Sequence, residues 1–258
     1  MTARGAEVVY VTLTDGSAGT RDLELTLSRL AEIRRREQEE ARILGVKELI
    51  WLGYRDAYLP YSPEVRDRLI YILRKYRPEV VLAPDPLLLY EVHPDHRHAG
   101  FLAAEASFFT PLPNVNRESL SEGLTPFSPT YVVFYFTAEP NVYIDVAEVL
   151  EYKIEAVKGH RSHFGKNIEG ILRRIAEEQG SKIGVKYAEA FKAIKPYCLH
   201  CLGFFSRNSG AISLILCRLS STCCWPCRLL GRQSLRRGRV YRRHRGFRRL
   251  LRLQTRVS

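Results

Sequence analysis

Strand-like and helix-like segments alternate through residues 1–196, and this order constrains the fold more than any other feature of the chain. Short β-branched and apolar runs that end at turn residues indicate the strands, and apolar side chains spaced three or four apart indicate the helices. The strand-like segments cover residues 7–13, 46–52 and 79–83, and the helix-like segments cover 20–44 and 63–76. This order predicts an α/β fold with a mainly parallel sheet flanked by helices.

Residues that close and open helices support this division. Gly45 follows the first helical pattern as a C-cap, and Ser62 precedes the second as an N-cap. The segment 185–194 fits either a strand or a helix. Farther along the chain, two strands and two helices are predicted at residues 130–137, 142–144, 146–160 and 168–179.

Charge and cysteine content divide the chain after residue 196. All 28 Asp and Glu residues lie before this point, whereas residues 197–258 hold 14 of the 40 basic residues, every one of them Arg. The net charge of +12 therefore comes from the basic residues at the end of the chain. All six cysteines also lie there, so the preceding part cannot depend on disulfides. We predict a folded body over 1–196 and an Arg/Cys-rich tail over 197–258.

The tail admits three interpretations. Cys198-x-x-Cys201 and Cys224-x-x-Cys227 have nearly the spacing of a zinc ribbon, and the nearby arginines could bind the phosphates of a nucleic acid. A basic segment with apolar stretches could also lie on a membrane surface. The complete absence of Lys, Asp and Glu from the tail favours the third interpretation, a frame-shifted or otherwise non-native segment that is disordered.

Targeting signals are not evident. No N-terminal segment combines basic residues, an apolar run and a small-residue cleavage site, and no apolar run reaches the roughly 20 residues of a membrane-spanning helix. We therefore expect a cytoplasmic protein without a membrane span. No sequence feature sets an oligomeric state.

A group of histidines follows the strand predicted at 79–83 and carries the clearest chemical signal. His93 and His96 lie three apart where the next helix opens, so their rings can share one face, whereas His98 points elsewhere. Ligands bind beyond the carboxyl ends of strands in open α/β sheets, and neutral imidazole is a common metal ligand. The spacing alone is equally typical of an N-capped helix with solvated histidines.

Five motifs, in order, resemble the PIG-L/LmbE family of zinc-dependent N-deacetylases. The resemblance covers roughly residues 5 to 195. The histidine run His93-Pro-Asp-His96-Arg97 resembles the second histidine motif of that family. The other motifs are Thr12-Leu-Thr-Asp15-Gly16, Arg34-x-x-Glu37-x-x-x-Ala41-x-x-Leu44-Gly45, Leu52-Gly53-Tyr-Arg55-Asp56 and Lys153-x-x-Ala156-x-x-x-His160-x-Ser162.

The resemblance implies a Rossmann-like fold and metal-assisted hydrolysis of an N-acetyl group on an N-acetylglucosamine-type conjugate, a small-molecule partner. Zinc would generate a hydroxide nucleophile and polarise the amide carbonyl. His96 would be the zinc ligand, and His93 would stabilise the tetrahedral oxyanion, oriented by Asp95.

Three further residues would line the sugar pocket in such an enzyme. The resemblance assigns this role to Asp15, Arg55 and Asp56. Each has a simpler interpretation, because Arg55 and Asp56 could form an exposed ion pair in a loop and Asp15 could only shape a turn.

The chain also departs from the family pattern. Family members begin with a strand that ends in a His-Pro-Asp-Asp motif, which supplies two zinc ligands and the general base, but the chain contains no His-x-Asp-Asp sequence. His96 is then the only matched ligand, whereas a catalytic zinc needs about three from the protein. We expect a sheet that lacks the family's first strand, poor folding, and no activity.

Two other functions remain open from the sequence. The chain could bind nucleic acid through its Cys/Arg-rich tail, with the body as a scaffold. It could also bind a sugar conjugate without catalysis, having kept the pocket and lost the metal.

Overall fold

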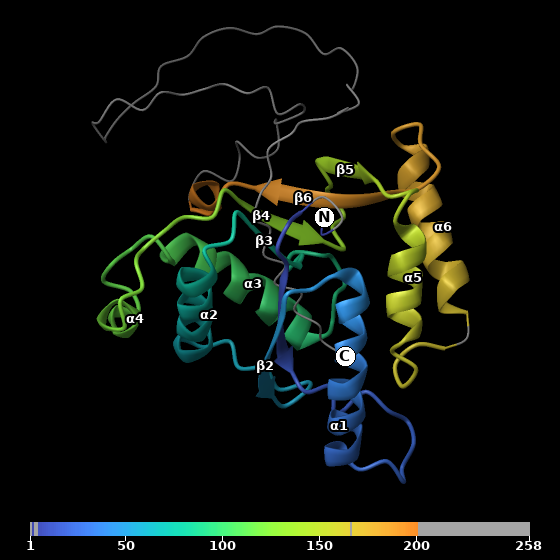
Figure 1. Cartoon of the computed structure of the whole chain (residues 1–258), viewed down its shortest axis with the longest axis horizontal. Helices are drawn as coiled ribbons and strands as arrows, with labels where there is room; N and C mark the ends of the chain where they lie inside the picture. The colour runs from blue at the N-terminus through green and yellow to red at the C-terminus, as the bar shows by residue number, and fades with distance from the viewer. Residues whose placement is uncertain (1, 3–4, 166, 201–258) are drawn as a thin grey trace, which may run out of the picture.

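The computed structural model describes residues 2, 5–165 and 167–200, whose strands and helices are shown in Figure 1. The strands are β1 (Val9–Thr14), β2 (Glu48–Tyr54), β3 (Val80–Pro84), β4 (Tyr131–Tyr135), β5 (Val142–Asp145) and β6 (Ala188–Ile194). The helices are α1 (Leu27–Gln38), α2 (Pro63–Tyr76), α3 (Pro94–Phe109), α4 (Arg117–Ser121), α5 (Leu150–Lys158) and α6 (Ile168–Ser181), with 3-10 turns η2 (Glu39–Leu44) and η3 (Pro196–Leu199).

The strands form two sheets. β1 pairs with β2 in parallel, and β3 pairs with β4 in parallel. β6 lies between β4 and β5 and runs antiparallel to both, so the second sheet has the order β3-β4-β6-β5. The predicted α/β class is therefore confirmed, and the parallel pairings are those among the first four strands.

The two sheets share a core although they are not hydrogen-bonded to each other. Every residue of β1 and of β3 is buried. Val11 of β1 and Val81 of β3 belong to one apolar cluster, which also contains Leu69 of α2 and Leu102 of α3. Among the described residues, no strand pairs with the second edge of β1 or of β3. The predicted lack of the family's first strand stays a prediction.

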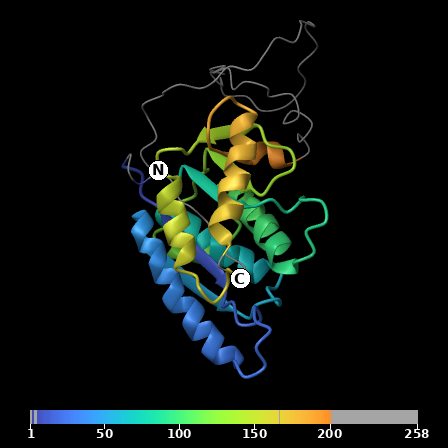
Figure 2. The same cartoon turned by 90° about the vertical axis from the view of Figure 1, so that its right-hand side faces the viewer.

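Helices cover the strands on two sides. α2 and α3 pack together on one side, and α1, α5 and α6 lie on the other (Figures 1 and 2). Successive residues at the start of β1 face the two sides. Val9 and Val11 belong to the cluster with α2 and α3, whereas Tyr10 and Val8, which precedes the strand, pack with Val46. This alternation is the period of two that a strand buried on both faces requires.

The first helix is shorter than predicted. It begins at Leu27 rather than near residue 20, with Thr26 as N-cap accepting from the Arg29 N–H at 3.3 Å. The preceding segment turns instead, because Asp22 accepts a hydrogen bond from the Glu24 N–H through its side chain and competes with helix formation. Gly45 is the C-cap of η2 with φ of 71°, so the helical region ends where expected.

The later elements also follow the sequence with shifted ends. α5 begins at Leu150 rather than at 146, because the Asp145 side chain accepts from the Ala147 N–H and forms a turn there. The ambiguous segment 185–194 contains β6, whose pairing with β4 and β5 decides in favour of a strand. α2 covers 63–76 as predicted, with Ser62 at the N-cap position.

The described chain remains packed on the body through residue 200. Leu199 packs against the main core cluster, and the His200 ring stacks on Phe108 with 5.3 Å between centroids. The predicted boundary at residue 196 stays a prediction, as do the calls on the tail 197–258, of which residues 201–258 lie outside the described residues. No helix in the described part of the chain is long and apolar enough to cross a membrane.

Candidate active site

The loops that follow β1 and β2 are joined by the carboxylate of Asp15. Its Oδ1 accepts hydrogen bonds from the Ser17 and Asp56 N–H groups, both at 3.0 Å. The Asp15 N–H donates to the Tyr54 carbonyl at the end of β2. Asp15 thus shapes a turn, and that turn also fixes the backbone of Asp56. Its predicted place in a sugar pocket stays a prediction.

Asp56 is almost completely buried, with 1% of its surface exposed. Its Oδ2 accepts from the Ala18 N–H at 3.0 Å, and its Oδ1 accepts from the Ala57 N–H at 3.0 Å. The neighbouring Arg55 is exposed and lies over the Tyr58 ring, 4.3 Å from its centroid. These contacts take the place of the exposed ion pair between Arg55 and Asp56 that the sequence left open.

Asp95 connects α3 to the loop after β2. It lies in the first turn of α3 and is fully buried. Its two carboxylate oxygens accept from the Ala57 N–H at 2.7 Å and from the Leu59 N–H at 2.9 Å. A buried carboxylate needs such donors, because unpaired it would carry a large desolvation cost. Its predicted role in orienting His93 stays a prediction.

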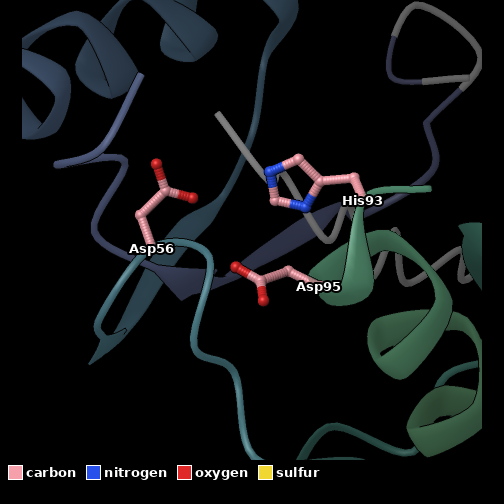
Figure 3. Close-up of side chains that lie close together, drawn as sticks. All are labelled: Asp56, His93 and Asp95. Atoms are coloured by element: carbon pink, nitrogen blue, oxygen red, sulfur yellow. The ribbon is translucent and has the colours of Figure 1, made fainter. Parts of the chain in front are cut away.

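The side chains of Asp56, in the loop after β2, and of His93 and Asp95, at the start of α3, lie close together (Figure 3). One ligand atom from each lies within 4.8 Å of the others, so the three could hold a metal ion. The Nδ1 atom of His93 is buried without a hydrogen-bond partner. Buried polar atoms are almost always hydrogen-bonded. An imidazole nitrogen without a partner beside two carboxylates therefore indicates a position where a metal ion or another ligand could bind.

His96 lies against His93, as its spacing predicted, with the rings stacked 4.7 Å apart. Its Nδ1 is 2.8 Å from Oε2 of Glu91, a residue to which sequence reasoning gave no role. Burial raises the pKa of Glu91, but hydrogen bonds from the His96 ring and the His93 N–H, with the charges of both imidazoles, lower it overall. A carboxylate five residues before His96 was the available signal.

Two of the sequence motifs meet away from the histidines. Glu37 of α1 accepts from the Ser162 N–H at 2.7 Å and from the Ser162 hydroxyl at 2.6 Å. Arg34, one turn earlier and buried, donates to the carbonyls of Gly19 at 3.1 Å and Ser162 at 3.3 Å. Burial lowers the pKa of Arg34, although Glu37 and Asp56 act to raise it.

A small hollow lies between this cluster and the carboxyl end of β1. The side chains of Thr14 and Arg34 each leave one buried atom, Oγ1 and Nε, without a hydrogen-bond partner. The hollow is lined by Thr12, Thr14, Asp15, Gly16, Arg34, Gln38, Trp51, His160 and His163. Asp15, whose carboxylate fixes Asp56, is the lining residue that links this hollow to the candidate site.

Known proteins match this chain closely. A family model described as PIG-L, GlcNAc-PI de-N-acetylase, matches residues 1–107. The diacetylchitobiose deacetylase of Thermococcus kodakarensis is 46% identical over 210 residues, which cover 79% of this chain and 78% of the relative. The chain belongs to the PIG-L family. A probable N-acetyl-α-D-glucosaminyl L-malate deacetylase 2 of Bacillus anthracis is 30% identical, with 67% of this chain and 75% of that protein covered.

A solved structure of the PIG-L family gives the same result for the fold. The N,N′-diacetylchitobiose deacetylase of Pyrococcus horikoshii, in complex with its inhibitor MPG, matches with a TM-score of 0.75 and 47% identity. The match covers 79% of this chain and 78% of that one. The predicted membership of an N-deacetylase family, whose members hydrolyse C–N bonds, is confirmed together with the flanked parallel sheet.

Proposed function

We propose that this PIG-L chain carries a site for metal-dependent hydrolysis of the N-acetyl group of an N-acetylglucosamine-type conjugate. The observation that carries the proposal is the convergence of Asp56, His93 and Asp95 beside His96 at the carboxyl edge of β1 and β2. The relatives support the substrate class, since their names record deacetylases of diacetylchitobiose and of an N-acetylglucosaminyl malate.

The side chains of the candidate site are of the chemical types that bind zinc. Imidazole nitrogens and carboxylate oxygens are ligands that zinc takes in catalytic sites. Two ring nitrogens are available at this site. Nδ1 of His93 is buried without a hydrogen-bond partner, and His96 is hydrogen-bonded through Nδ1, which leaves its Nε2 for a metal ion or a substrate. Bound there, zinc would supply a hydroxide nucleophile and polarise the amide carbonyl.

The chain's own residues then have distinct tasks. His96 would bind the metal through Nε2, and His93 would donate a hydrogen bond to the oxyanion that develops on the acetyl carbon. Asp95 holds the loop after β2 against α3. The neighbouring Asp56 and Arg55 would thereby keep a fixed position relative to the bound sugar. Asp15 fixes the same loop from the β1 side.

The ligand set of residues 1–258 is incomplete. Without a His-x-Asp-Asp sequence, the chain offers His96 as the one ligand matched to the family pattern, and Asp56, His93 and Asp95 are the further side chains that could hold the ion. It lacks the carboxylate that the missing motif would supply as general base. We propose that the chain by itself binds the amino sugar but releases no acetate. A non-catalytic sugar binder differs from this proposal because its sugar affinity would be unaffected by zinc or by a chelator.

A titration with N,N′-diacetylchitobiose tests the binding half of the proposal. Amide shifts of the ¹⁵N-labelled chain should change saturably at Ala18 and Ala57, which border Asp56, at sugar concentrations up to about 1 mM. Asp56→Asn should weaken binding, and the exposed Asp22→Asn should not. Changes that never saturate, or equal affinity in both variants, would contradict the proposal.

A further inference from the structure

The carboxylate of Glu91 bridges the two histidines of the candidate site. Its Oε1 accepts from the backbone N–H of His93 at 2.8 Å, and its Oε2 lies 2.8 Å from Nδ1 of His96. The side chain is 19% exposed and the His96 side chain 27%, so the pair is largely shielded from water. One side chain therefore controls both the position of the His93 backbone and the orientation of the His96 ring.

The direction of the hydrogen bond determines the tautomer of His96. The two groups are within hydrogen-bonding distance, and an ionised carboxylate has lone pairs but no N–H or O–H to donate, so Glu91 accepts and the ring nitrogen donates. The proton between the two groups therefore sits on Nδ1 of His96. In the neutral ring, Nε2 is then left with its lone pair available.

A second contact fixes the plane of the same ring. His93 stacks on His96 with 4.7 Å between centroids and 20° between planes. His93 is the N-cap of α3, and its N–H is the group that Glu91 holds through its other oxygen. Glu91 thus acts on His96 directly and also through the position of its stacking partner.

We propose that Glu91 is a positioning residue that holds His96 as the Nδ1–H tautomer and directs its Nε2 into the site. The step from this tautomer to metal binding rests on the proposed function, because metal-binding histidines commonly donate their other N–H to a carboxylate that fixes the ring. The alternative is that Glu91 only caps the start of α3 through His93, with no influence on the imidazole.

Long-range ¹H–¹⁵N spectra of the full chain, without metal and at about pH 8, distinguish these roles because they report which ring nitrogen carries the proton. His96 should be the Nδ1–H tautomer in the wild type and should change to mainly Nε2–H in Glu91→Ala. The exposed Glu118→Ala should leave it unchanged. A His96 that is Nε2–H in the wild type overturns the proposal even if Glu91→Ala fails to fold, and so does a tautomer that stays Nδ1–H in a folded Glu91→Ala.

Zinc titration of the same variants separates this inference from the proposed function. If both hold, Glu91→Ala lowers zinc affinity about 10- to 100-fold relative to the wild type and Glu118→Ala. If the wild type binds no zinc while the tautomer changes as described, the proposed function fails and the positioning role of Glu91 stands. Equal zinc affinity in all three proteins would contradict the metal-directed part of the inference.

Discussion

Asp95 belongs to the histidine motif, and its contacts show that it also joins α3 to the loop after β2. Both of its oxygens accept backbone N–H groups, those of Ala57 and Leu59, inside a region closed to water. The motif therefore sets the geometry of the loop that carries Asp56. The sequence predicted the residue, but the partners lie 36 and 38 positions away and could not be read from it.

Replacing Asp95 by Asn tests this linkage. The amide can accept through only one atom, so one of the two N–H groups loses its partner in a buried position. The free energy of unfolding should fall by about 1–3 kcal/mol in urea denaturation. Asp22→Asn, at an exposed loop position, is the control, and an Asp95→Asn variant as stable as that control would contradict the structural role.

Arg74 marks the limit of sequence analysis for single residues. Its place on an amphipathic helix is typical of a solvated side chain, yet only 1% of Arg74 is exposed. Its guanidinium donates to oxygens of the segment after α3, at Thr110, Leu112, Asn116 and Ser119. Glu91 is a similar case, because its partners decide its role and only the fold reveals them.

At the scale of elements, α3 approaches β3 closely because residue 100 is a glycine. A Cβ at this position would lie 2.5 Å from the Pro84 carbonyl oxygen and 2.8 Å from Cδ of Pro86. The close approach brings the first turn of α3, with its histidines, to the carboxyl end of β3. The alternation of strands and helices predicted these elements, but not how near they would lie.

Gly100→Ala should therefore separate α3 from β3. Neither backbone nor proline ring can yield easily, so the variant should lose about 1–3 kcal/mol of stability in urea denaturation. Ala103→Gly, one turn later on the same helix, is the comparison for an exchange between Ala and Gly at another buried position. A fully stable Gly100→Ala would show that the contact between α3 and β3 is looser than described.

The ion pairs between α5 and α6 give a dependence on pH. Hydrogen bonds from Arg173 lower the pKa of Glu151, against the small effect of burial, at 2.6 and 2.8 Å. A lowered folded-state pKa stabilises the protein above the unfolded value of about 4.3, and this contribution is lost as the pH falls through the folded value. Arg173→Gln should lower the Tm slightly at pH 7.

The same comparison at a pH below the folded-state pKa of Glu151 completes this prediction, because the carboxylate is then protonated in both states. Thermal unfolding followed by circular dichroism should give equal Tm values for wild type and Arg173→Gln there. A difference that persists unchanged at low pH would show that Arg173 acts through packing rather than through its charge.

The whole molecule is two sheets around one core, with β1 and β3 buried but each paired on one side among the described residues. The sequence predicted the α/β class, because the alternation of strand-like and helix-like segments can be read from a single chain. It did not predict that β6 would return antiparallel, because strand direction depends on long-range pairing.

Hydrogen exchange should reveal this one-sided pairing. Successive amides of a strand point to opposite edges, so in β1 the N–H groups directed at β2 should exchange slowly and the alternate ones faster. β4, paired on both sides, should show no such alternation. Uniform protection along β1 would mean that its second edge is paired as well.

Acetate release from N,N′-diacetylchitobiose in the presence of zinc tests the central claim most directly. Residues 1–258 should release none above background, whereas the same chain extended at its N-terminus by a strand ending in His-Pro-Asp-Asp should release acetate. His96→Ala in the extended protein should abolish that release. Turnover by residues 1–258 alone, or none by a folded extended protein, would contradict an N-deacetylase site that lacks only its remaining ligands and base.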